Sequence, residues 1–187
     1  MSVVSFRYDQ RISDGDRNVL REYCSELGGN VVALARRLGL KVYEMDLPDD
    51  QSGYIEYDEF CGSKSGYRIV VNAKHSLQRK QFTAAHEIGH FVLHRNTKQF
   101  RENGRETADI FHFPSGYRSE DSWDYNADYP QWMEREADAF AVNVLLPANT
   151  VRRSPEFING EPIALAKKLS FSKAFVLRRF EELCFDE

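Results

Sequence analysis

Two histidines four residues apart, with a glutamate beside the first, form the segment of this sequence with the clearest chemical meaning. The segment is His86-Glu87-Ile88-Gly89-His90. On a helix, residues i and i+4 lie one turn apart on the same face, so both imidazoles can reach one ion while Glu87 sits beside it. This arrangement is typical of a catalytic zinc site that hydrolyses its substrate with a metal-activated water. His86 and His90 would supply half of such a site.

A zinc hydrolase needs three protein ligands and one open position for water. The metzincin solution would place a histidine at the tenth position after His86, but this chain has Asn96 there. A better candidate lies in the segment EREAD, residues 134–138, where Glu134 and Asp138 are again four apart on one helix face.

The EREAD segment resembles the Glu-x-x-Ala-Asp element of glutamate-type zincins. In such sites the glutamate binds zinc and the aspartate accepts a hydrogen bond from a ligand histidine. We therefore predict that Glu134 is the third ligand and that Asp138 orients His86. Glu136, about 200° around the helix from Glu134, stays open as an alternative ligand.

Glu87 is the predicted catalytic residue. Two histidines and one carboxylate leave zinc positive enough to bring the pKa of a bound water toward about 7. Glu87 would accept a proton from that water and pass it to the leaving amine. His112 and Tyr117 are open candidates for stabilising the oxyanion.

The elements that must position these residues follow from periodicity and from cap residues. We predict helices over residues 16–27, 30–39, 76–94, 130–146, 161–169 and 172–183, a strand over 40–47, and a hairpin of 53–60 with 67–72. Residues 95–129 lack regular periodicity and form a long excursion. The predicted fold is α+β and zincin-like, with helices packed on a small twisted antiparallel sheet and a helix-turn-helix-like pair at 161–184. We expect substrate to bind as an added strand at residues 67–72 or at the neighbouring hairpin strand.

Composition limits the class of protein. The 187 residues suit a single domain over 1–187, and 42% hydrophobic with 29% charged residues is ordinary for a globular chain. No segment is apolar enough to span a membrane, and the start of the chain lacks a signal peptide, so we expect a cytoplasmic protein. Three scattered cysteines argue against disulfides and against cysteine-bound zinc. A net charge of -4 gives no broad attraction to nucleic acid.

The sequence resembles the ImmA/IrrE family of metallopeptidases over roughly residues 20–183. The resemblance rests on FTAAHEIGHFVLH (82–94), EREADAFAVNVLLP (134–147), ALARRLGL (33–40) and the strand 67–72. It implies an intracellular zinc endopeptidase whose targets include helix-turn-helix repressors, with relief of repression in mobile-element transfer or stress responses. Two features depart from the family pattern: the family more often has Asn in place of Asp138, and the excursion at 95–129 is longer than usual.

Three hypotheses for function follow from these features. The first is a zinc-dependent endopeptidase that cleaves a regulatory protein, such as a helix-turn-helix repressor or an antitoxin-type partner. The second is a non-catalytic zinc-containing module that docks to a transcription factor or toxin. The least favoured is DNA binding by the C-terminal pair, whose basic residues also suit a solvated face. These are Lys167, Lys168, Lys173, Arg178 and Arg179.

Overall fold

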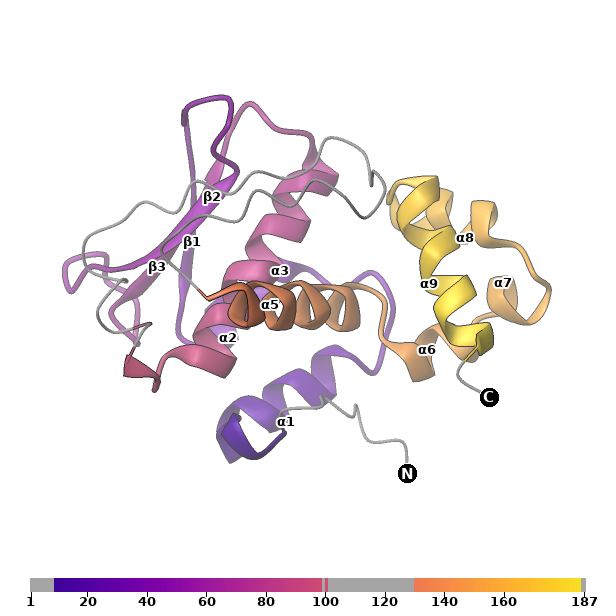
Figure 1. Cartoon of the computed structure of the whole chain (residues 1–187), viewed down its shortest axis with the longest axis horizontal. Coiled ribbons are helices and arrows are strands. Elements are labelled where there is room, and N and C mark those ends of the chain that lie inside the picture. Colours follow the sequence, from indigo (N-terminus) through magenta and orange to yellow (C-terminus); the bar gives the residue numbers. More distant parts are fainter. Residues whose placement is uncertain (1–8, 99, 101–129, 186–187) are drawn as a thin grey trace.

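The computed structural model describes residues 9–98, 100 and 130–185. Figure 1 shows a small sheet with helices packed against it and a separate group of short helices that follows α5. The predicted α+β class is confirmed, while the single domain over 1–187 stays a prediction. The helices are a 3-10 turn η1 (Asp9–Arg11), α1 (Asp14–Tyr23), α2 (Val31–Arg37), α3 (Leu77–His94), α5 (Gln131–Leu145), α6 (Ala148–Arg152), α7 (Pro155–Ile158), α8 (Pro162–Leu169) and α9 (Lys173–Phe185). The strands are β1 (Lys41–Met45), β2 (Gly53–Tyr57) and β3 (Tyr67–Asn72).

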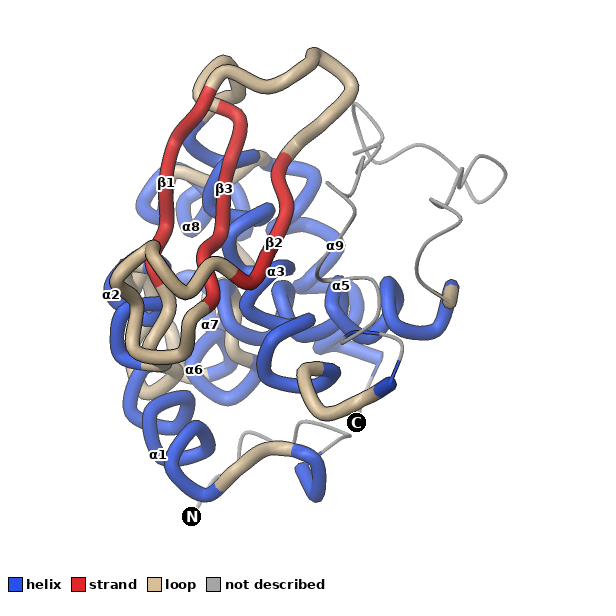
Figure 2. Tube along the Cα trace, turned by 90° about the vertical axis from the view of Figure 1, so that its left-hand side faces the viewer, coloured by secondary structure: helices blue, strands red, loops and turns tan. Residues whose placement is uncertain are grey.

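Strand β3 lies in the middle of the sheet, between β1 and β2 (Figure 2). It pairs antiparallel with β2, as the predicted hairpin requires, but parallel with β1. The sheet is therefore mixed, and the prediction of a wholly antiparallel sheet is wrong. Ile69, Val70 and Val71 are all buried, and such a continuous apolar run suits a strand that is covered on both faces. Residues 67–72 consequently cannot be the edge that binds substrate, whereas β2 is an edge strand.

Helix α3 is the central helix of the fold. The Ser76 side chain accepts a hydrogen bond from the Arg79 backbone N–H, which confirms the predicted start of the helix. Every residue from Thr83 to His94 is buried, because β2 and β3 cover one side of the helix and α5 covers another. A helix enclosed in this way holds its polar side chains in fixed positions.

The N-terminal helices complete the main hydrophobic core. In α2 the Asn30 side chain accepts a hydrogen bond from the Ala33 N–H, which confirms the predicted start of this helix, and Gly39 follows the helix with a positive φ of 86°. Helix α1 starts earlier than predicted, because Ser13 caps the N–H of Asp16. Leu20 and Leu34 of these helices join Ile69 of the sheet in one buried cluster.

The C-terminal helices form a second buried cluster, which includes Leu146, Leu165 and Val176. Helices α6 and α7 were not predicted, while α8 and α9 lie close to the predicted ranges. Arg179 joins this cluster to the end of α5: its guanidinium donates to the Leu146 carbonyl at 3.0 Å and to Asn143 Oδ1 at 2.8 Å.

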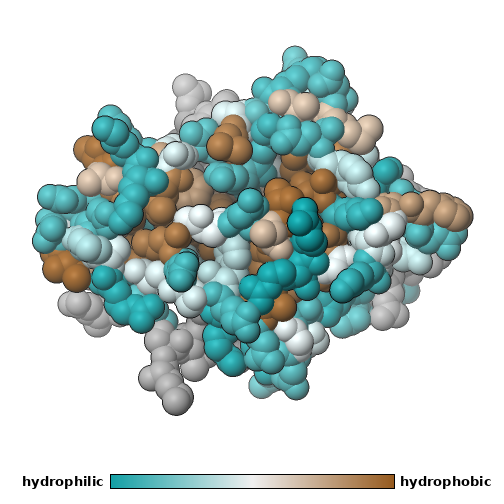
Figure 3. All heavy atoms as spheres, turned by 180° about the vertical axis from the view of Figure 1, so that it is seen from behind, coloured by the Kyte–Doolittle hydropathy of each residue, from teal (hydrophilic) through white to brown (hydrophobic). Residues whose placement is uncertain are grey.

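Hydrophobic residues on the face shown in Figure 3 are interspersed with hydrophilic ones. Among the described helices, none is both long enough and apolar enough to cross a membrane.

Candidate metal centre

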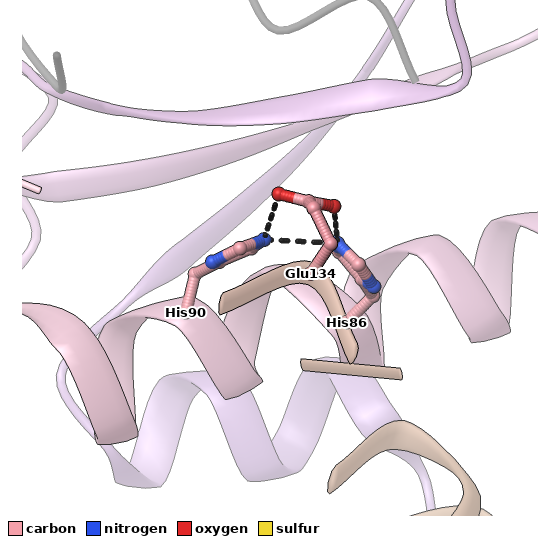
Figure 4. A group of neighbouring side chains, drawn as sticks. All are labelled: His86, His90 and Glu134. Carbon is pink, nitrogen blue, oxygen red and sulfur yellow. Dashed lines mark hydrogen bonds and ion pairs between the residues drawn. The ribbon is translucent and has the colours of Figure 1, made fainter. Parts of the chain in front are cut away.

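Three side chains from two helices converge on one point inside the protein: His86 and His90 of α3 and Glu134 of α5 (Figure 4). Their ligand atoms all lie within 4.8 Å of one another. The Nε2 atoms of the two imidazoles are 2.9 Å apart, and the Glu134 oxygens lie 3.3 Å from Nε2 of His86 and 3.2 Å from Nε2 of His90. The structure therefore brings together the three residues that the sequence suggested as ligands.

These distances suit a tetrahedral zinc ion. Zinc binds histidine nitrogen and carboxylate oxygen at about 2.0–2.1 Å, which places neighbouring tetrahedral ligands about 3.4 Å apart. The two nitrogen–oxygen distances, 3.3 and 3.2 Å, are close to that edge length, and the nitrogen–nitrogen distance of 2.9 Å is somewhat shorter. Two imidazoles and one carboxylate are also the ligand set of many catalytic zinc sites. The residues present fit a metal ion of this kind.

The third ligand reaches the histidines because α3 and α5 approach each other very closely. A Cβ atom at Gly89 would lie 3.1 Å from the Cα of Ala137 and 3.1 Å from Cδ1 of Phe140. Gly89 is thus the contact point on α3, and Ala137 is the contact point on α5, one turn after Glu134. The glycine and the alanine allow the close helix crossing that places the carboxylate beside the imidazoles.

The electrostatics of the cluster favour a positive charge at this point. Burial alone would lower the pKa of His86, but its hydrogen bonds with Asp138 and Glu134, and their charges, raise that pKa well above its usual value. Burial alone would raise the pKa of Glu134, but the charges and hydrogen bonds of His90 and His86 hold it well below its usual range. Without a metal, a proton on His86 supplies the positive charge; zinc would have to displace that proton.

Asp138 lies where the sequence placed it. Its Oδ1 accepts a hydrogen bond from Nδ1 of His86 at 2.8 Å. Because a carboxylate only accepts, this contact puts a hydrogen on Nδ1 and fixes the plane of the imidazole ring. With that nitrogen occupied, Nε2 of His86 is the atom that faces His90 and Glu134.

His94 and Glu136 have contacts that the sequence did not indicate. His94, fully buried, lies one turn after His90, and their Nδ1 atoms are 3.2 Å apart. Burial lowers the pKa of His94 to about 4, so this imidazole is neutral near neutral pH. Glu136, the alternative ligand, instead accepts a hydrogen bond from Nε2 of His94 at 2.8 Å and lies outside the cluster around Glu134.

Glu87 is completely buried beside His86 on α3, and its catalytic role stays a prediction. The two candidates for oxyanion stabilisation, His112 and Tyr117, fall outside the described residues, as does most of the predicted excursion at 95–129.

Three of the five C-terminal basic residues make contacts with other residues of the protein. Arg179 is buried against Leu146 and Asn143. Lys168 and Arg178 pair with the carboxylates of Glu156 and Glu182. DNA binding by the C-terminal pair stays the least favoured of the three hypotheses.

Comparisons with known proteins find a similar fold and a matching family model. Among solved structures, a Mycobacterium tuberculosis transcriptional regulator has a similar fold, with a TM-score of 0.53 at 18% sequence identity. The likeness covers 95% of this chain but 50% of that one, so the chain spans about half the length of the regulator. A search of curated proteins finds no match.

Residues 35–181 match the family model Peptidase_M78, described as the IrrE N-terminal-like domain. This match confirms the resemblance to ImmA/IrrE proteins that the two motifs indicated. Since it extends over well more than half of the sequence, the chain belongs to the IrrE N-terminal-like family of peptidases.

Proposed function

We propose that this chain is a zinc-dependent endopeptidase in which His86, His90 and Glu134 hold the metal and Glu87 is the catalytic residue. The observation that carries the proposal is the convergence of three buried ligand atoms within 4.8 Å on two crossing helices. Three protein ligands leave the fourth position of a tetrahedral ion open, which is the feature that separates catalytic from structural zinc. Family membership supports the same activity.

Each residue has a distinct role in the proposed reaction. Bound zinc supplies a Lewis acid and lowers the pKa of water toward about 7. Glu87 accepts the proton of the attacking water and later donates a proton to the leaving amine. Asp138 keeps the imidazole of His86 in the tautomer whose Nε2 lone pair points toward the metal position.

Strand β2 is the proposed binding edge for an extended substrate. One side of β2 pairs with β3, and no other described strand pairs with its second side. The strand also lies directly against the zinc-binding helix: a Cβ at Gly53 would lie 2.6 Å from Cγ2 of Thr83, which is one turn before His86. A peptide added to β2 would therefore run past the metal site and gain backbone hydrogen bonds along its length.

The proposed substrate is a regulatory protein, such as a helix-turn-helix repressor or an antitoxin-type partner, and the proposed location is the cytoplasm. The support for both is the resemblance to ImmA/IrrE peptidases. Free cysteines are consistent with a reducing compartment, since Cys24, Cys61 and Cys184, the three cysteines of the chain, form no disulfide.

Cleavage profiling tests the activity on a broad set of peptides instead of a single chosen protein. The zinc-loaded parent is incubated with a proteome-derived peptide library, and new N-termini are identified by mass spectrometry. The matched control is Glu87→Gln, which keeps the size of the side chain and removes its ability to accept the proton. We expect new termini with the parent alone, while the variant binds equal zinc and cleaves nothing.

Equal cleavage by parent and Glu87→Gln would refute the role of Glu87. Zinc binding without any cleavage by the parent would refute the endopeptidase and favour the docking module.

A further inference from the structure

His94 is a buried histidine that contacts a proposed metal ligand without being a ligand itself. It follows His90 by one turn on α3, and the Nδ1 atoms of the two rings lie 3.2 Å apart. Both side chains are completely buried. Two nitrogens at this distance inside a protein can make a hydrogen bond only if one carries a hydrogen and the other a lone pair.

Glu136 decides which nitrogen carries the hydrogen. Its Oε2 lies 2.8 Å from Nε2 of His94, and an ionised carboxylate can only accept. Nε2 of His94 must therefore be the donor. A neutral imidazole has one N–H, so Nδ1 of His94 is left with a lone pair and accepts from Nδ1 of His90. The lone pair of His90 then lies on Nε2, the atom that faces His86 and Glu134.

Arg11 holds the far end of this chain of contacts. Its Nη1 lies 2.8 Å from the same Oε2 atom that accepts from His94. The side chain of Glu136 is only 12% exposed, so the ion pair is largely shielded from water on the carboxylate side. The edge-to-face contact of the Trp132 ring with His94, with centroids 5.5 Å apart, covers the histidine further. We call the contacts from His90 through His94 and Glu136 to Arg11 the relay. The relay connects η1, the first described turn, to the candidate metal centre.

The two proposed histidine ligands are oriented by different routes. His86 donates directly to a carboxylate, that of Asp138. His90 reaches its carboxylate through one intervening imidazole. Metal-binding histidines usually donate their second nitrogen to an acceptor of this kind, and loss of that acceptor weakens metal binding.

We propose that His94 and Glu136 are positioning residues that set the tautomer and ring orientation of His90, with Arg11 fixing the carboxylate. The inference rests on the proposed function, because it assigns the purpose of the relay to zinc binding. It makes Glu136 a residue of the metal centre, although Glu136 is not a ligand.

Two substitutions of Glu136 show whether its oxygen matters as a hydrogen-bond acceptor or its side chain only fills space. Glu136→Met keeps the length of the side chain but removes the oxygen acceptor. Glu136→Gln keeps an oxygen that can accept from His94 but removes the charge. We expect the zinc dissociation constant, measured by competition with a chromophoric chelator, to rise by about 10- to 100-fold for Glu136→Met. For Glu136→Gln the rise should be smaller.

Glu156→Met is the matched control, because Glu156 is also an ion-paired and mostly buried glutamate, with a side chain 15% exposed against Lys168. This variant should bind zinc as the parent does. The tautomer of His90 is read separately in the zinc-free protein by long-range 1H–15N correlation of the imidazole. The parent and Glu156→Met should show the Nδ1–H form, whereas Glu136→Met should show a mixture of both forms.

The outcomes distinguish the relay from the function on which it rests. A parent that binds no zinc overturns both proposals. A parent that binds zinc, together with a Glu136→Met variant of equal affinity and unchanged His90 tautomer, overturns the relay alone. Equal losses in Glu136→Met and Glu136→Gln with an unchanged tautomer would also overturn it, because acceptance by an oxygen would then be irrelevant.

Discussion

Replacing Gly89 by Ala tests whether the close crossing of α3 and α5 builds the metal centre. The added Cβ would meet the Cα and the carbonyl oxygen of Ala137 at 3.1 and 3.2 Å, so α5 must yield by a few tenths of an ångström. Overpacking of this kind costs about 1–3 kcal/mol, and alanine regains about 1 kcal/mol of helix propensity. The free energy of unfolding should therefore fall by only about 0–2 kcal/mol.

Gly89→Ala should weaken zinc binding more clearly than it lowers the free energy of unfolding. Metal–ligand distances tolerate deviations of about 0.2 Å, and Glu134 lies one turn from the displaced part of α5. We expect the zinc dissociation constant to rise by about tenfold or more, equivalent to about 1.4 kcal/mol. Competition with a chromophoric chelator measures this constant, and denaturant unfolding of the zinc-free protein measures stability.

Gly15→Ala is the control for the helix-propensity gain. Gly15 is exposed in α1, and the nearest atom to an added Cβ is 4.0 Å away. Because Gly15 is the second residue of α1, this variant should gain less than the about 1 kcal/mol expected in a helix interior, and it should bind zinc normally. If Gly89→Ala were equally stabilised and bound zinc as tightly as the parent, the dependence of the metal centre on the close helix crossing would be refuted.

Three further predictions concern the metal, the cysteines and the C-terminal helices. Zinc at 100 times its dissociation constant should stabilise the parent by about 2.7 kcal/mol, which raises the melting temperature by about 5–10 °C. A shift of the same size in Glu134→Ala would contradict the assignment of Glu134 as a zinc ligand. Burial raises the pKa of the Cys24 thiol to about 12, so at pH 8 it stays protonated and unreactive. A thiol reagent should label exposed Cys184 in the native protein and Cys24 only after unfolding, as peptide mass spectrometry can show. Arg179→Met should lower the free energy of unfolding, measured with denaturant, by about 1–3 kcal/mol, because buried acceptors lose their donor. Arg178→Met, at an exposed ion pair, should lower it by at most about 0.5 kcal/mol. Equal effects of the two substitutions would contradict the structural role of Arg179.

The residues of the candidate metal centre were predictable because they come as two pairs, and the members of each pair are close in sequence. A spacing of four residues places His86 and His90 on one helix face, and Glu134 and Asp138 on another. This relation depends only on the local helix and not on tertiary contacts. The caps at Asn30 and Ser76 are equally local, since each side chain bonds to a backbone N–H three residues later. The family pattern then indicated that the two helices meet.

Features that depend on contacts between distant segments were not predictable in the same way. The central position of β3 follows from its pairing with both β1 and β2, and periodicity says nothing of which strands pair. Arg11 and Glu136 are 125 residues apart in sequence, so their ion pair left no local signal. Arg179 looks like any other basic residue of an amphipathic helix, although it is buried against the end of α5. The spacing of four residues between His90 and His94 was the one sequence feature that pointed to the relay.

Anomalous diffraction at the zinc edge from crystals of the zinc-loaded protein tests the metal centre most directly. We expect one peak about 2.0–2.2 Å from Nε2 of His86, Nε2 of His90 and a carboxylate oxygen of Glu134, with the remaining position held by water. A peak away from these atoms would contradict the assignment of the ligands. A fourth protein ligand in place of the water would contradict a catalytic role for the metal.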